Sequence, residues 1–193
     1  MHFNLPTALT WLRIVLIPVL VVIFHLADAT LGASAKNLAA TIVFVVAAVT
    51  DWLDGYLARR LNQTSAFGAF LDPVADKLMV AAALVVLVWL DRAEDWVAIV
   101  IIGREIAISA LREWMAQLGA AKSIAVNFLG KVKTFAQMVA IPLLLYWEPI
   151  GDFPTQFLGT WLLYLAAVLT LVSMAYYLKM ALPGLKGKIV QRP

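Results

Sequence analysis

Apolar residues occur in six long runs that are separated by short polar stretches. Each run contains about 20 residues or more, which is enough for a helix to cross a hydrocarbon core roughly 30 Å thick. The polar stretches contain residues typical of turns and helix ends. The pattern therefore predicts six transmembrane helices, over residues 5–27, 37–60, 67–90, 95–118, 123–147 and 155–182.

The composition also indicates a membrane protein. Of the 193 residues, 63% are hydrophobic and 14% are charged, compared with about 25% charged residues in soluble domains. The apolar excess extends along the whole chain, so we predict an all-α integral membrane protein with one membrane domain, residues 1–182. Residues 183–193 contain three basic residues and no acidic one, and we expect them to form a basic cytoplasmic tail.

Charged residues are distributed unevenly between the two sides of the predicted helix bundle. If the N-terminus is cytoplasmic and the helices alternate in direction, the outer connections contain two basic and six acidic residues, a net charge of −4. The inner half then contains thirteen basic and six acidic residues, a net charge of +7. Because Lys and Arg accumulate on the cytoplasmic side of membrane proteins, we predict that both termini are cytoplasmic.

The scarcity of two residue types excludes several kinds of chemistry. The chain has no cysteine, which excludes disulfides, thiolate nucleophiles and zinc–thiolate sites. Its two histidines, His2 and His25, are too few for a histidine-rich metal site. The first apolar run contains Arg13 and follows no basic stretch, so we expect a retained helix and not a cleaved signal peptide.

Four aspartates are spaced so that they fall on two helix faces. Asp51 and Asp54 are three residues apart, and Asp72 and Asp76 are four apart. Both pairs lie near the cytoplasmic ends of consecutive predicted helices, which a tight polar turn joins, so the four carboxylates can meet. The ordinary alternative is that each aspartate pairs with a basic residue at a helix end, but four aspartates on two faces favour a shared site. The basic candidates for that alternative are Arg59, Arg60 and Lys77.

Four carboxylates that face one another repel, and divalent cations relieve this repulsion. Ligands that are all oxygen, without His or Cys, favour a hard ion such as Mg²⁺ or Mn²⁺. Four carboxylates can hold a pair of ions about 3.5–4 Å apart. Such a pair suits a diphosphate substrate, because it neutralises the phosphate oxygens and stabilises a leaving phosphate.

Small and basic residues accompany the aspartates. Gly55 and Gly68 would let a phosphate or a planar base approach the backbone closely, and the small Ala58 clears the same face. Arg59 can donate two hydrogen bonds to phosphate oxygens. Pro73 removes a backbone donor and should bend the third helix near the site.

These residues form a known signature. The pattern D-x2-D-G-x2-A-R-x8-G-x3-D-x3-D occupies 26 residues without a gap, and the chain resembles the CDP-alcohol phosphatidyltransferase family. The resemblance extends to the stretches FNLPTALTWLRIVLIP, REIAISALREWMAQLG and GKVKTFAQM. The fixed positions of the signature are Asp51, Asp54, Gly55, Ala58, Arg59, Gly68, Asp72 and Asp76.

The resemblance implies a fold, a reaction and a set of roles. It implies six membrane helices, often in a homodimer, with a polar cavity that opens to the cytoplasmic side of a bacterial inner membrane. It implies transfer of a phosphatidyl group from CDP-diacylglycerol to sn-glycerol 3-phosphate, giving phosphatidylglycerol phosphate and CMP. The expected partners are these two substrates, membrane lipids and a second copy of the chain, and no nucleic acid is expected to bind. The four aspartates would bind the metal ions and Asp76 would be the general base, whereas spacing alone indicates only that one carboxylate could stay partly free. CDP-diacylglycerol would be bound by Asp51, Asp54, Gly55, Ala58, Arg59, Gly68 and Asp72.

A phosphorylated acceptor requires a second basic pocket. Arg112 on the fourth predicted helix and Lys131 and Lys133 at the start of the fifth are the residues we expect to bind the acceptor phosphate. The alternative is that these side chains anchor the protein at the membrane surface. Arg104 lies deeper and could instead pair with Glu105 or with a neighbouring helix.

Two further features leave alternatives open. Asn4, Pro6, Thr10 and Arg13 form a polar stripe that would either line the entry of the donor lipid or belong to an interfacial anchor. The Trp and Tyr residues near helix ends are typical of aromatic belts at the membrane surface.

Two rival functions are consistent with parts of the pattern. A related synthase could use another alcohol, such as inositol phosphate or serine. The basic residues favour a phosphorylated acceptor over serine, and the wider resemblance favours glycerol phosphate. A divalent-cation transporter would also place acids in its helices. The clustering of the aspartates at one face, without a matching polar series in the outer half, argues against a conduit.

Overall fold

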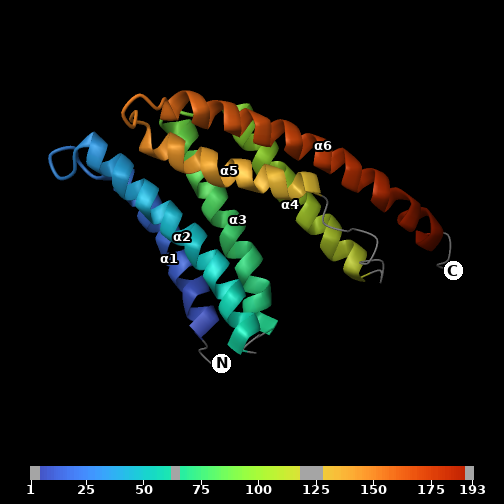
Figure 1. Ribbon diagram of the computed structural model, residues 1–193. Helices are drawn as coiled ribbons and strands as arrows, with labels where there is room; N and C mark the ends of the chain where they lie inside the picture. Colours follow the sequence, from blue (N-terminus) through green and yellow to red (C-terminus); the bar gives the residue numbers. More distant parts are fainter. Residues whose placement is uncertain (1–4, 62–65, 118–127, 190–193) are drawn as a thin grey trace.

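The computed structural model describes residues 5–61, 66–117 and 128–189, and all six predicted helices are present in it (Figure 1). The second helix begins four residues earlier than predicted, and the sixth continues past the predicted end at residue 182. The helices are α1 (Leu5–His25), α2 (Ala33–Leu61), α3 (Ala66–Trp89), α4 (Asp95–Gln117), α5 (Phe128–Tyr146) and α6 (Thr155–Ile189).

Three of the helices are long and apolar enough to cross a membrane, judged over the described residues. They contain the spans Ala8–His25, Ala33–Asp54 and Thr155–Lys179. The apolar part of α3 is shortened by Asp72, Asp76 and Lys77, and α4 carries charged residues near its middle and its end. The prediction of a helical membrane protein is therefore confirmed in its coarser form, whereas the described parts of the other three predicted spans do not meet this criterion.

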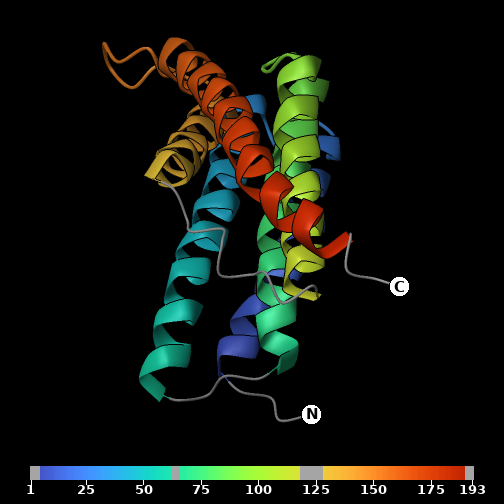
Figure 2. The same cartoon turned by 90° about the vertical axis from the view of Figure 1, so that its right-hand side faces the viewer.

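The helices alternate in direction, so that their ends form two sides of the molecule. The connections 26–32, 90–94 and 147–154 lie at one side, which we call the loop end. The starts of α1 and α3 and the end of α2 lie at the other side, which we call the aspartate end (Figures 1 and 2). α1 packs against α2 and α3, α5 runs along α6, and α4 packs against α6.

Apolar side chains from α1 to α6 form a continuous core between these two ends. The core includes fully buried residues such as Leu20, Leu84, Ile101 and Leu144. α5 and α6 approach closely at Gly159, where an added Cβ would lie 2.9 Å from the Leu144 side chain. Small residues at helix contacts are a common means of close packing in membranes.

Local backbone geometry ends the helices at the loop end. Asp91 has a φ of 55°, and the Arg92 amide donates to the Leu87 carbonyl at 2.9 Å, the arrangement of a Schellman cap. Trp147, with a φ of 65°, follows α5. These turns fix the side chain of Arg92 at the junction of three helices.

Candidate active site

The aspartates of α2 face a buried arginine from α1. Arg13 has 1% of its surface exposed, and its Nη2 donates to the Asp54 carboxylate at 2.5 Å. Its Nη1 lies 2.8 Å from an Asp51 carboxylate oxygen, an ion pair without the alignment of a hydrogen bond. Asp54 is buried and Asp51 is 42% exposed. One guanidinium thus joins the two aspartates that begin the signature.

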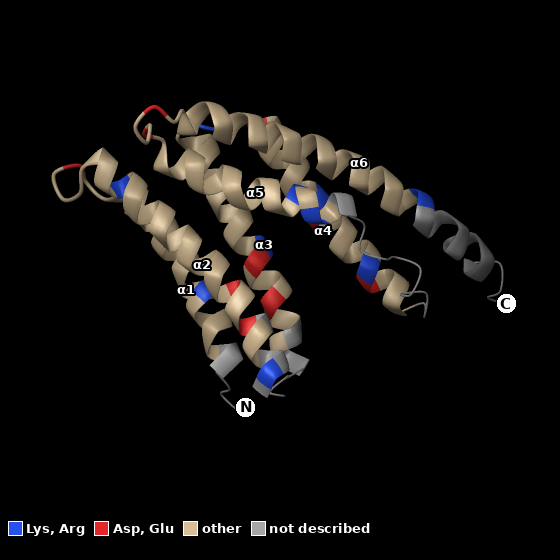
Figure 3. Ribbon diagram, viewed as in Figure 1, with Lys and Arg blue, Asp and Glu red and all other residues tan. Residues whose placement is uncertain are grey.

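The aspartates of α3 lie beside this pair. Asp72 accepts a hydrogen bond from the hydroxyl of Thr10 on α1. Asp51 is close enough to Asp72 and to Asp76 to repel both electrostatically. Figure 3 shows the acidic positions of α2 and α3 gathered toward the same end of the molecule. The described part of the structure therefore brings the four aspartates into one electrostatic cluster.

The chemistry of this cluster fits hard cations, although its geometry is not that of a formed metal site. Among the described residues, no three Asp, Glu or His side chains converge closely enough to hold an ion. Arg13 offsets one of the four negative charges, and Lys77 attracts Asp76. The remaining negative charge and the all-oxygen ligand set are suited to Mg²⁺ or Mn²⁺.

Asp76 lies between the aspartate cluster and a second group of charges. It lines a small cavity of about 10 Å³ together with Arg13, and a neighbouring cavity of about 60 Å³ together with Glu105. Val80 and Met138 line both cavities, so the two are adjacent. A proton acceptor at Asp76 would therefore be within reach of groups bound on either side.

The second group of charges joins α4, α5 and α6. Glu105 forms an ion pair with Lys133, and Arg104 lies 3.4 Å from the same carboxylate oxygen. Arg104 also donates to the Ser173 hydroxyl of α6 at 2.9 Å. Both alternatives for Arg104, pairing with Glu105 and pairing with a neighbouring helix, are therefore realised together.

Arg112 joins this second group through an aromatic ring. Its Nη2 donates to the Tyr177 hydroxyl at 3.2 Å, and its Cζ lies 5.3 Å from the centre of that ring. The Cζ of Arg104 lies 5.6 Å from the same ring centre. Lys131 is exposed, and it points away from the buried Lys133 because residues two apart diverge on a helix. We call Arg104, Glu105, Arg112, Lys133, Ser173 and Tyr177 the α4–α6 cluster.

Other predicted residues are described only in part. Gly55, Ala58 and Arg59 belong to α2, but their surroundings lie outside the described part of the chain, as does Asn4. Gly68 is buried in α3. Pro73 lies inside α3, which continues through it from Ala66 to Trp89.

Sequence reasoning missed the contacts that three residues, Thr10, Arg13 and Tyr177, make with the charged groups. The polar stripe of α1 gave no indication that Arg13 and Thr10 bind the signature aspartates, because that contact depends on how α1 packs. Tyr177 is an exception to the predicted aromatic belt, since only 2% of its surface is exposed. Five of the tryptophans that lie near helix ends are instead at least 45% exposed, as a belt requires (Trp52, Trp89, Trp96, Trp114 and Trp161).

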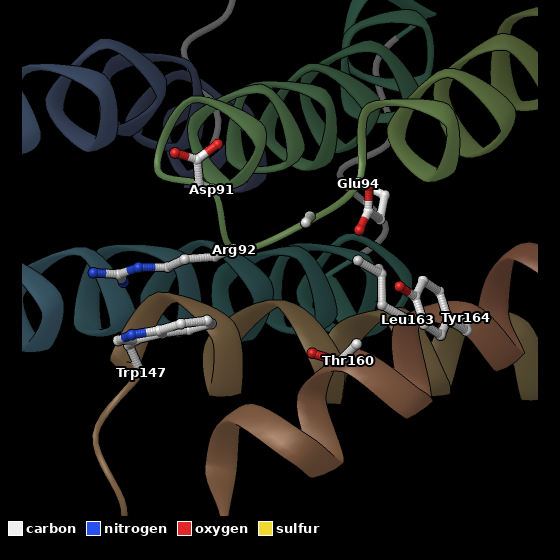
Figure 4. A pocket seen from close by; sticks show the side chains of 8 residues that line it. Asp91, Arg92, Glu94, Trp147, Thr160, Leu163 and Tyr164 are labelled. Carbon is white, nitrogen blue, oxygen red and sulfur yellow. The ribbon is translucent and has the colours of Figure 1, made fainter.

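The loop end contains a further arginine, Arg92, whose partners are different. Arg92 donates from Nη1 to the carbonyl oxygens of Leu144 and Leu145 and from Nη2 to the Asn37 side chain. Its Cζ lies 5.0 Å from the centre of the Trp147 ring. Figure 4 shows these two side chains together along a cavity of about 320 Å³ that Asp91 and Glu94 also line.

The cluster of signature aspartates and the helical membrane fold define a class of enzyme. The profile of the CDP-alcohol phosphatidyltransferase family matches residues 3–172. The chain belongs to this family, and the resemblance seen in the sequence is confirmed.

Particular members of the family are similar over nearly the whole chain. The CDP-diacylglycerol–glycerol-3-phosphate 3-phosphatidyltransferases of Escherichia coli (strain K12) and Shigella flexneri are each 53% identical over 184 residues, which cover 94% of this chain and 96% of the relative. The enzyme of the same name from Salmonella choleraesuis (strain SC-B67) is 52% identical over the same length.

Proposed function

We propose that this protein transfers the phosphatidyl group of CDP-diacylglycerol to sn-glycerol 3-phosphate, giving phosphatidylglycerol phosphate and CMP. The observation that carries the proposal is the position of Asp76 between a cluster of acids and a cluster of bases. The acids suit a cation-bound diphosphate, and the bases suit a phosphorylated acceptor. The similarity to glycerol-3-phosphate enzymes over 94% of the chain supports the choice of acceptor.

The aspartates have distinct roles in this proposal. Asp51, Asp54, Asp72 and Asp76 would hold divalent ions, Mg²⁺ or Mn²⁺ and preferably a pair. When bound, such ions neutralise the diphosphate oxygens and stabilise the departing phosphate. Arg13 and Thr10 orient three of these carboxylates from α1. On the nucleotide side, the donor also contacts Gly55, Ala58, Arg59 and Gly68.

The transfer itself is a displacement at phosphorus. The glycerol 3-phosphate hydroxyl attacks the β-phosphorus that bears the diacylglycerol, and the bond from that phosphorus to the bridging oxygen breaks. Asp76 accepts the hydroxyl proton, and Arg59 binds the CMP that leaves. A positioned base contributes about 10²–10⁴ to such a rate.

In this proposal Arg112 and Lys133 bind the acceptor phosphate beside Arg104, and the exposed Lys131, which points away from Lys133, adds positive charge at the edge of the pocket. Arg supplies a planar pair of donors and Lys a mobile charge. Substituting any one of Arg112, Lys131 or Lys133 by Gln should raise the glycerol 3-phosphate KM by about ten- to a hundredfold. The donor KM should change little. If the three side chains only anchor the protein, its insertion will change and the acceptor KM will not.

Orientation and assembly follow from the charge asymmetry and the family. We propose that the protein lies in a bacterial inner membrane as six spans, that the active-site cavity and both termini face the cytoplasm, and that two copies form a homodimer. A reporter protein that works only in the cytoplasm should be active when it is fused after Pro193. A reporter that is active only outside the cytoplasm would overturn this orientation.

The choice of acceptor is tested by substrate replacement. Purified protein is incubated with CDP-diacylglycerol and Mg²⁺, with glycerol 3-phosphate, serine or inositol phosphate as the acceptor, and CMP release is measured. We expect CMP to be released with glycerol 3-phosphate and with neither of the other two acceptors. Release that is faster with serine or inositol phosphate would assign the protein to another reaction of the family, and metal flux without any release would favour a transporter.

A further inference from the structure

Tyr177 is a buried residue of α6 that contacts two arginines of α4 at once. The Cζ atoms of Arg104 and Arg112 lie 5.6 Å and 5.3 Å from its ring centre. Its hydroxyl accepts a hydrogen bond from Arg112 at 3.2 Å. Two guanidinium groups repel each other, and the negative face of one ring can offset part of this repulsion. The ring therefore sets the spacing of two like charges.

Ser173 provides a second contact one helical turn before Tyr177. Its side chain is fully buried, and its hydroxyl donates to the Thr170 carbonyl at 2.9 Å. Because this bond uses the hydroxyl proton, the oxygen lone pairs are left to accept from Arg104, which lies 2.9 Å away. Two positions of α6 thus fix Arg104, while Tyr177 is the described side chain of this helix that contacts Arg112.

The α4–α6 cluster has more positive than negative charge. Arg104, Arg112 and Lys133 carry three positive charges against the single negative charge of Glu105, which leaves a net charge of +2. Arg104 is 6% exposed, and its Nε is buried without a hydrogen-bond partner in the described structure. A phosphate monoester supplies about two negative charges and three acceptor oxygens, which match this excess.

We propose that Tyr177 is a positioning residue for the acceptor phosphate, which it serves by holding Arg104 and Arg112 beside the same ring for donation to one phosphate group. The inference deepens the proposed function and rests on it, because the ligand is the phosphate of glycerol 3-phosphate. It adds α6 to a site that the sequence assigned to the fourth and fifth helices alone. Tyr177 does not touch the reacting atoms and acts through the two arginines.

The test is a kinetic comparison of neighbouring tyrosines. In Tyr177→Phe the ring remains but the hydroxyl bond to Arg112 is lost, and we expect the glycerol 3-phosphate KM to rise by about tenfold. Tyr177→Leu also removes the ring and should raise this KM further. The donor KM should stay close to its wild-type value in both. Tyr176→Phe is the matched control, because Tyr176 is the adjacent residue, is exposed and packs edge-on against Tyr177.

If Tyr177 acts through Arg112, the effects of substituting the two residues should not add. In an Arg112→Gln background, Tyr177→Phe should add little to the acceptor KM, because the bond it removes no longer exists. Additive effects would contradict the inference. So would a loss of folded protein, or equal changes in the two KM values, since a purely structural role predicts those results.

Failure of this inference can be distinguished from failure of the proposed function. If Arg112→Gln and Lys133→Gln raise the acceptor KM while both Tyr177 variants leave it unchanged, the pocket is right and the role of Tyr177 is wrong. If none of these substitutions changes the acceptor KM, the acceptor phosphate binds elsewhere and both proposals are overturned.

Discussion

The aspartate end and the loop end of this molecule each contain an arginine that links helices, but the partners of the two arginines differ in kind. Arg92 at the loop end donates to two backbone carbonyls and an amide, which are neutral groups fixed by the helices that carry them. Arg13 faces two carboxylates within a cluster of four. Neutral, fixed partners stabilise a fold. The four carboxylates around Arg13 carry more negative charge than one guanidinium offsets, so this site can also bind other cations.

The same contrast separates the α4–α6 cluster from the loop end. Arg104 has a buried Nε with no partner in the described structure, and Arg104 and Lys133 there share the single carboxylate of Glu105. Buried polar groups without partners cost free energy, and such groups are typical of sites that are completed by a ligand. The comparison predicts that substitutions at the aspartate end or in the α4–α6 cluster lower activity. Substitutions at the loop end should instead lower stability.

Removing divalent ions should produce the largest effect. We expect rigorous chelation to abolish CMP release, because four carboxylates cannot approach a diphosphate without cations between them. Mg²⁺ or Mn²⁺ should restore the rate, and the helical content by circular dichroism should not change. Full activity in the chelated protein would remove the basis of the metal-binding assignment.

Asp76→Asn should have the next largest effect. Loss of a general base should lower the rate of CMP release by about 10²–10⁴, with CDP-diacylglycerol binding largely retained. Asp51→Asn should instead weaken metal and nucleotide binding together. Rates and donor affinity are measured on equal amounts of folded protein. A rate for Asp76→Asn above a few per cent of wild type would show that the base is another group.

Arg92→Gln tests the loop end. The substitution leaves the carbonyls of Leu144 and Leu145 and the side chain of Asn37 without their donor, and we expect a loss of about 1–3 kcal/mol in the free energy of unfolding. Activity per folded molecule should remain near wild type. Arg92→Lys is the control, since it keeps the charge but lacks the planar set of donors. A large fall in the activity of the folded Arg92→Gln protein would contradict the assignment of the loop end to stability alone.

The smallest expected effect is pH-dependent and also lies at the loop end. The Lys36 ammonium lies 2.7 Å from the Asp28 carboxylate and holds the pKa of Asp28 below its ordinary value of 3.8. A carboxyl with a lowered pKa in the folded state contributes stability above its unfolded pKa, and this contribution is lost as the pH falls through the folded pKa. Asp28→Asn should therefore lower the Tm slightly at neutral pH, since an exposed ion pair contributes little. The difference from wild type should vanish in acid, and a difference that persisted there would have another cause.

Much of this architecture was accessible from the sequence, because apolar periodicity and a fixed signature are local features. The six helices and the two aspartate pairs follow from residue spacing within single helices. The predicted end of the sixth helix at residue 182 was wrong, since α6 continues to Ile189. The ion pairs of Arg13 and the burial of Tyr177 were missed because they depend on contacts between helices that are distant in the chain.

The central claim is that the protein transfers a phosphatidyl group to glycerol 3-phosphate and does not merely cleave its donor. It is tested most directly by following CMP and phosphatidylglycerol phosphate together after purified protein is mixed with CDP-diacylglycerol, glycerol 3-phosphate and Mg²⁺. We predict that the two products appear in equal amounts and that neither appears when the acceptor is left out. CMP released without the lipid product would indicate hydrolysis and would contradict the account.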